Sequence, residues 1–196
     1  DAQDDILAVA RSCTSHYVAF CSQDDGWHPD KLFCCVGALD RDQALICAHA
    51  VTLIDANSDY VGFLSQGITR GKLHPALALP PFGSFLFSSQ VVRRSVLDVV
   101  PWTAQAVEGS CQPMSCARWL YVLGTSLGST VTLAHPLMAH RQSRSSGAGS
   151  PWNILARWSG RVWGSTSFLV QHQAEAEQCA RLMTHIAQDV DGPFAS

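Results

Sequence analysis

The sequence predicts one domain of the all-β class, an antiparallel sandwich or barrel with a C-terminal α-helix. With 196 residues, the chain can bury one full core but is short for two. Short apolar runs recur along it, mostly separated by Gly, Pro or Ser, as is typical of short strands joined by turns. Residues 174–190 differ, because their apolar side chains fall on one face of a helix: Ala176, Cys179, Leu182, Met183 and Ile186. We therefore treat residues 1–196 as a single domain.

The elements are expected in a simple order. Residues 4–13 should form a helical turn or two within an N-terminal extension, residues 1–15. Three extended runs should follow: YVAFCSQDDGW from Tyr17, closed by a polar Asp-Asp-Gly turn, then KLFCCVGAL, then ALICAHAV after a polar DRDQ turn. Further strands are expected at 60–64, 84–87, 119–123, 130–134, 153–158 and 161–163, and an exposed loop at 141–150.

Composition narrows the possible partners. The net charge is −3, and no apolar run approaches the roughly 18 residues that span a bilayer, so we expect a soluble chain without membrane insertion. The arginines of the second half are scattered and match no nucleic-acid-binding motif, so no nucleic acid is expected as a partner.

Cysteine usage points to an oxidising compartment. Eight cysteines are many for a cytosolic chain, and the even number favours disulfides, whose pairing the sequence does not specify. The sequence has no CxxC motif, and the adjacent Cys34 and Cys35 cannot easily supply two ligands to one tetrahedral ion. The chain begins at Asp1 without a leader, as a processed secreted chain or a truncated one would. We therefore expect a secreted, disulfide-bonded protein with no metal and no cofactor.

Residues 16–51 resemble the opening of a chymotrypsin-like (trypsin-like) serine protease. The run at 17–20 matches the first barrel strand, 33–39 the family's FCGGSL-like run, and 44–49 its WVLTAAH-like run. The resemblance implies two packed antiparallel β-barrels and places His49 at the general base. One departure is immediate, because Ala50 stands where the family usually has a cysteine.

The rest of the triad is damaged in this alignment. Asp98, in the apolar run VLDVV, matches the carboxylate that orients the histidine; an alternative alignment puts Ser84 or Pro75 there and leaves Asp98 on the surface. Reading back from Pro151 places Ala148 at the nucleophile, where no hydroxyl is available for acyl-enzyme chemistry. The resemblance therefore implies a catalytically defective serine protease homologue, a pseudoenzyme that binds another protein of unknown identity.

Four other interpretations stay open. The run GTSLG resembles the nucleophile elbow of α/β-hydrolases, with Ser126 as nucleophile of an active esterase, although little chain remains for the later Asp and His. A divergent but active serine protease is a related possibility. Cys116 could be a thiol nucleophile paired with His135 or His140. Finally, 116–140 can be drawn as one long helix, which would indicate a helical protein-interaction domain without protease ancestry.

Overall fold

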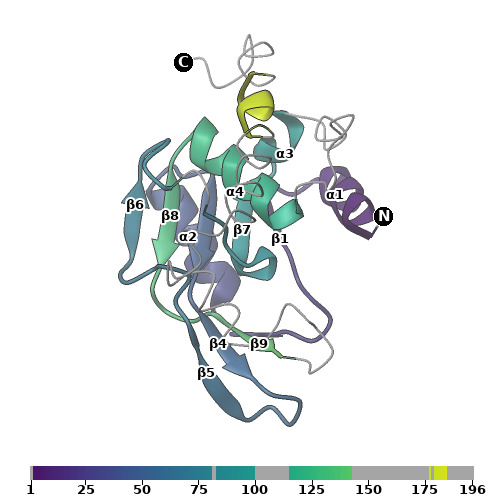
Figure 1. The fold of residues 1–196 in the computed structure, drawn as a ribbon, viewed down its shortest axis with the longest axis vertical. Helices are drawn as coiled ribbons and strands as arrows, with labels where there is room; N and C mark the ends of the chain where they lie inside the picture. The colour runs from purple at the N-terminus through teal and green to yellow at the C-terminus, as the bar shows by residue number, and fades with distance from the viewer. Residues whose placement is uncertain (1, 81–82, 100–114, 143–176, 178, 185–196) are drawn as a thin grey trace, which may run out of the picture.

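The computed structural model describes residues 2–80, 83–99, 115–142, 177 and 179–184 (Figure 1). These residues form a mixed α/β fold with two open sheets, so the all-β prediction of two closed barrels is wrong. The elements are α1 (Ala2–Ser12), β1 (Tyr17–Ala19), β2 (Gly26–Trp27), α2 (Lys31–Arg41), β3 (Ile46–His49), β4 (Val51–Ile54), β5 (Tyr60–Leu64), β6 (Lys72–His74), η1 (Phe87–Ser89), β7 (Gln90–Arg93), α3 (Ser95–Val99), α4 (Cys116–Leu127), β8 (Thr130–Leu133) and β9 (Met138–Arg141).

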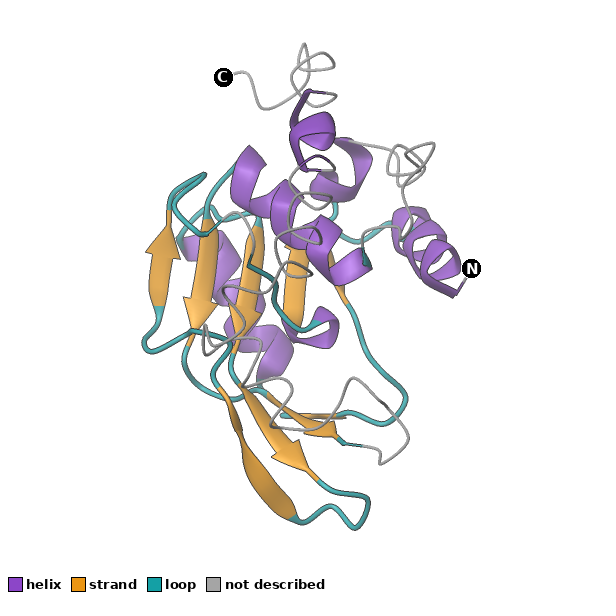
Figure 2. Ribbon diagram, in the orientation of Figure 1, coloured by secondary structure: helices purple, strands orange, loops and turns teal. Residues whose placement is uncertain are grey.

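The first sheet has the strand order β1-β7-β3-β8-β6. Strands β3 and β8 are parallel, whereas β7 is antiparallel to both β1 and β3. Strands β1, β3 and β8 therefore point the same way, and their carboxyl ends share one edge of the sheet, as the arrows in Figure 2 show. We call this end of the sheet, where these three strands terminate, the carboxyl edge.

The second sheet begins where the first one ends. Only Ala50 separates β3 from β4, so one stretch of chain passes from the first sheet into the second. The second sheet has the order β2-β9-β4-β5, and it extends away from the carboxyl edge of the first (Figure 1). The carboxyl edge is therefore a seam between the two sheets.

Both faces of the first sheet are covered. Along β3, Ile46 and Ala48 face the core under α4, whereas Cys47 faces the core under α2. Because β3 is covered on both faces, all four residues of ICAH are buried, and the run shows no alternation of polar and apolar residues.

The predicted strand at 31–39 is the helix α2. Its buried residues are Lys31, Cys35, Ala38 and Leu39, a spacing of four, three and one that follows the helical period. The run KLFCCVGAL reads as a strand because it is almost continuously apolar, and a short apolar run does not distinguish a buried helix from a buried strand.

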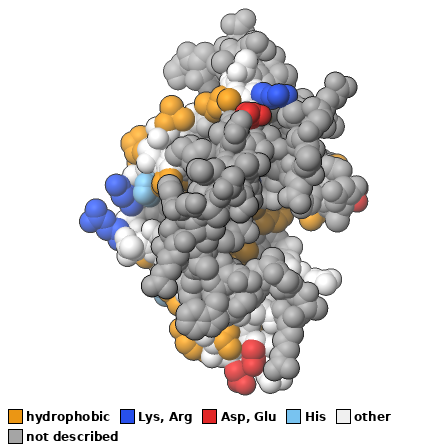
Figure 3. Space-filling view, in the orientation of Figure 1, with side chains coloured by type: hydrophobic (Ala, Val, Ile, Leu, Met, Phe, Trp, Pro, Cys, Tyr) orange, Lys and Arg blue, Asp and Glu red, His pale blue; other side chains and the backbone are white. Residues whose placement is uncertain are grey.

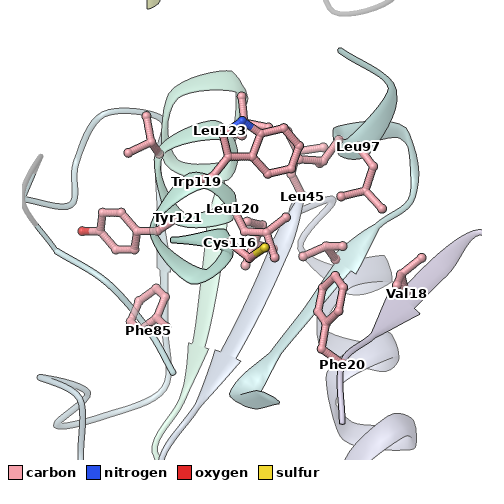
Figure 4. Close-up of a cluster of buried hydrophobic side chains, with 14 of the residues drawn as sticks. Val18, Phe20, Leu45, Phe85, Leu97, Cys116, Trp119, Leu120, Tyr121 and Leu123 are labelled. Atoms are coloured by element: carbon pink, nitrogen blue, oxygen red, sulfur yellow. The ribbon is translucent and has the colours of Figure 1, made fainter. Parts of the chain in front are cut away.

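The predicted strand at 119–123 is likewise part of a helix, α4. The Ser115 side chain caps it by accepting a hydrogen bond from the backbone N–H of Arg118 at 3.3 Å. Trp119, Leu120 and Leu123 enter the main core, as Figure 4 shows. The helix ends at Leu127 and β8 follows, so the single helix over 116–140 is also wrong.

Of the remaining predicted elements, some are confirmed, one is wrong and some lie outside the described residues. The helix at 4–13 and the strands at 60–64 and 130–134 are confirmed by α1, β5 and β8. Residues 84–87 form no strand and lead into the 3₁₀ turn η1. Residues 177 and 179–184 are helical, and Leu182 is buried in the main core. The loop predicted at 141–150 overlaps β9 at Arg141. The rest of that loop from 143 on, the remainder of 174–190 and the strands predicted at 153–158 and 161–163 lie outside the described residues.

Candidate functional site

The carboxyl edge gathers polar and titratable residues from three strands. A turn with Asp24 and Asp25 follows β1, His49 ends β3, and His135 comes just after β8. In open α/β sheets, ligands bind outside the carboxyl ends of the strands, because the backbone there opens into loops that carry side chains. This edge is therefore the candidate site of the described chain.

The turn after β1 points its two carboxylates in different directions. The Asp25 N–H donates to the Ser22 carbonyl at 3.2 Å, which leaves Asp24 at the exposed corner of the turn. The next residues, Gly26 and Trp27, pair with β9, and this pairing draws Asp25 inward. One carboxylate thus faces solvent and its neighbour enters the seam.

Asp25 is paired with His140 across this seam. His140 Nδ1 lies 2.7 Å from Asp25 Oδ1, and the Asp25 side chain is 0% exposed while that of His140 is 28% exposed. Burial opposes ionisation of Asp25, but the hydrogen bond from His140 and the nearby Ser88 hydroxyl outweigh it, so the pKa of Asp25 is lowered. Because an ionised Asp25 can only accept, the proton of this hydrogen bond is on Nδ1 of His140. The second oxygen, Oδ2, has no hydrogen-bond partner.

Lys31 is buried beside this pair. Its Nζ donates to the Ser88 carbonyl at 2.6 Å and lies 4.0 Å from the ring centroid of Trp27. Burial lowers the pKa of Lys31 to about 8, although neighbouring groups, Asp25 among them, oppose the shift. The ammonium therefore contributes positive charge to the seam near neutral pH.

His49, the predicted general base, is part of the core. The side chain is 0% exposed, and Nδ1 donates to the Ala50 carbonyl at 2.7 Å, which makes Nε2 the unprotonated nitrogen. Nε2 is buried without a partner, and burial lowers the pKa of His49 to about 4. The Gln66 amide also donates to the His49 carbonyl at 2.7 Å. This imidazole is sealed from any substrate in solvent.

The structure does not bring the predicted triad together. Asp98 lies in α3 with its side chain 50% exposed, and it pairs with Arg94 at 2.9 Å. Because α3 follows β7, which runs opposite to β3, Asp98 lies at the other edge of the sheet from His49. No hydrogen bond joins these two described residues, and Ala148 lies outside the described residues. The protease resemblance thus loses its structural basis.

The rival nucleophiles are also poorly placed. Ser126 lies in the last turn of α4, where a strand follows the helix, whereas an elbow serine stands between a strand and the helix after it. A Cβ at Gly124 would overlap the Ile46 side chain, so the first glycine of GTSLG serves close helix-to-sheet packing. Cys116 is buried in the main core. No disulfide joins any two of the described cysteines, which are Cys13, Cys21, Cys34, Cys35, Cys47, Cys116 and Cys179.

Comparison with protein-family models and with curated proteins finds no match to either. None of the described helices has both the length and the apolar character needed to cross a bilayer.

The sequence predicts a turn at the Asp-Asp-Gly segment, but Asp24 and Asp25 were not among the predicted site residues. The signal was available: two consecutive carboxylates stand a few residues after an apolar strand and shortly before a helix. The partners Lys31 and His140 carried no such signal, because one begins a helix and the other comes from a strand more than a hundred residues further on.

Proposed function

We propose that the chain is a divalent-cation-dependent enzyme that binds a nucleoside-diphosphate-linked donor at the carboxyl edge and transfers the group it carries. The observation that carries this proposal is the Asp24–Asp25 turn. This turn, between β1 and β2, presents the exposed carboxylate of Asp24 beside the ionised carboxylate of Asp25, which is fully buried against His140.

The charge of the turn favours a cation. Mg²⁺ and Mn²⁺ prefer oxygen ligands, and Mg²⁺ is usually held by one or two carboxylates together with the phosphates of a substrate. The described residues include no group of three or more His, Cys, Asp or Glu side chains that could enclose a metal alone. Asp24, the exposed carboxylate, would therefore hold the cation together with a diphosphate, and the cation would neutralise the leaving phosphate. The buried Asp25 would act on the cation only through its charge.

Location and acid–base chemistry support the same function. The fold supplies the place of the site by analogy with other α/β sheets, which bind nucleotides at the carboxyl ends of their strands. The residues supply the chemistry: His140, oriented by the buried Asp25, has Nε2 available to take a proton from an acceptor hydroxyl. The Lys31 ammonium adds positive charge behind the diphosphate.

The test is Mn²⁺ binding by the full chain, measured by electron paramagnetic resonance of free Mn²⁺ with and without ADP, GDP, UDP or CDP. We expect one of these nucleotides to increase the bound fraction of Mn²⁺. Replacing a metal ligand should weaken binding at least as much as loss of an outer partner does, so Asp24→Asn should weaken it by about tenfold or more.

Asp98→Asn is the matched control, because Asp98 is an exposed carboxylate at the opposite edge of the sheet. It should bind as the unchanged protein does. Equal Mn²⁺ binding by Asp24→Asn and the unchanged chain, or no effect of any nucleotide, would contradict the proposal.

Protein binding, expected from the sequence, remains a second candidate on different grounds. Strand β5 is an edge strand of the second sheet, and it exposes Tyr60, Val61 and Phe63 by 70%, 47% and 47%. Exposed apolar edge strands pair readily with another strand. If β5 pairs with a second copy, Val61→Lys should shift a concentration-dependent dimer to monomer in sedimentation equilibrium; a monomer at all concentrations would exclude this form of binding.

A further inference from the structure

A cavity of about 330 Å³ lies on the α4 side of the first sheet, between β6, β8, α4 and the loop before β6. None of its lining residues takes part in the function proposed above. We propose that this cavity binds a phosphate monoester with a small aromatic or similarly apolar body. Its volume is at the lower end of the range for small-molecule sites.

One wall of the cavity is cationic. Arg70 and Lys72 line it and are exposed, and none of the described lining residues is acidic. Figure 3 shows Lys or Arg side chains grouped on the flank of the molecule where β6 lies. Two fixed positive charges without an acidic neighbour in the wall match a doubly charged phosphate better than a single carboxylate.

His74 also lines this wall, and its hydrogen bonds determine its tautomer. The Thr132 hydroxyl donates to the Lys72 carbonyl at 3.2 Å, so its oxygen accepts from His74 Nε2, also at 3.2 Å. Nε2 therefore carries the proton and Nδ1 has none. When the doubly charged ester binds, uptake of one proton from solvent at Nδ1 would let His74 donate a hydrogen bond to a phosphate oxygen.

The opposite wall is apolar and rigid. Phe85 and Tyr121 are 5% and 3% exposed, and their rings meet edge to face with centroids 5.2 Å apart. The Tyr121 hydroxyl is fixed by donating to the Pro80 carbonyl at 2.7 Å. Leu79 completes this wall. Such a surface binds the flat body of an aryl ester through area burial and ring contacts.

The experiment is isothermal titration calorimetry of the full chain with 1-naphthyl phosphate, compared with inorganic phosphate and with 1-naphthol. We expect binding at one site, with each comparison ligand at least about tenfold weaker. Arg70→Gln and Lys72→Gln should each weaken the ester about tenfold, since a charge-assisted hydrogen bond contributes on the order of that factor. Leu79→Trp should fill the cavity and abolish binding.

Two controls separate this cavity from other sites. Arg94→Gln removes an arginine on the chain segment between β7 and α3 that does not line the cavity, and it should leave the affinity unchanged. Asp24→Asn should also leave it unchanged; if that substitution weakens ester binding, the ester occupies the carboxyl edge and the cavity proposal fails. Absence of binding, or equal affinity of Arg70→Gln and the unchanged chain, overturns it as well.

Discussion

Among the described residues, three ionisable side chains are buried at the seam between the two sheets: Asp25, Lys31 and His49. The protonation state of each is stabilised by different neighbours. Asp25 stays ionised because His140 donates to it, whereas Lys31 keeps its proton near neutral pH over the Trp27 ring with a carbonyl partner. His49 stays neutral because burial disfavours its charged form. Burying a charge without a partner costs several kcal/mol. The charged groups at the seam have such partners, so the seam is a polar site within the fold.

His49 should make the protein sensitive to acid. Its pKa is about 4 when folded and 6.5 when unfolded, so the unfolded chain binds more protons between these values. The stabilisation is complete above pH 6.5 and is lost as the pH falls toward 4, by up to about 3 kcal/mol. Urea unfolding from pH 4 to pH 7 measures it.

His49→Asn keeps a side-chain N–H that can donate to the Ala50 carbonyl but has no titrating group. We expect it to flatten the dependence of the free energy of unfolding on pH over this range. His16→Asn, at an exposed position, should keep the slope of the unchanged protein. A His49→Asn slope equal to that of the unchanged protein would contradict the burial of a neutral imidazole.

At the scale of elements, the two helices α2 and α4 decide the fold class. Each covers one face of the first sheet, and each comes from a run that reads as a strand in the sequence. Their glycines show how differently they pack. Gly124 in α4 lies against Ile46 of β3, whereas a Cβ at Gly37 in α2 would meet no atom within 4 Å.

Gly→Ala substitutions should therefore have opposite effects in the two helices. Gly124→Ala should force Ile46 or the helix to move and destabilise the protein by about 1–3 kcal/mol. Gly37→Ala should be neutral or stabilise by up to about 1 kcal/mol, because alanine is the better helix former. Thermal and urea unfolding of the pair measures this; destabilisation by both to the same extent would contradict the packing of α4 on β3.

The sequence was informative where a pattern is local. The α1 helix and the strands β5 and β8 follow from short-range periodicity, and the Asp-Asp-Gly turn from its composition. The strands predicted from the sequence at α2 and α4 are wrong, because helices and strands buried in an α/β core can both be continuously apolar. Neither the pairing of Asp25 with His140 nor the separation of His49 from Asp98 could be predicted, since both depend on the order of strands in the two sheets.

For the whole molecule, the central feature is that the chain passes from one sheet into the other at the carboxyl edge of three strands that point the same way. This arrangement places the end of β1, the Asp24–Asp25 turn and the strand β9 with His140 around one seam. At the opposite edge, the described acidic side chains Asp98 and Asp40 are each at least half exposed and each pairs with an arginine. We therefore assign the functional surface of the described chain to the seam.

The most direct test of this assignment is a backbone amide NMR titration of the full chain with Mg²⁺ and the nucleoside diphosphate that Mn²⁺ binding selects. We expect the largest shift changes at 22–28, 49–50 and 134–140, and none at 94–99. Changes centred on 94–99, or on the cavity beside β6 alone, would contradict it.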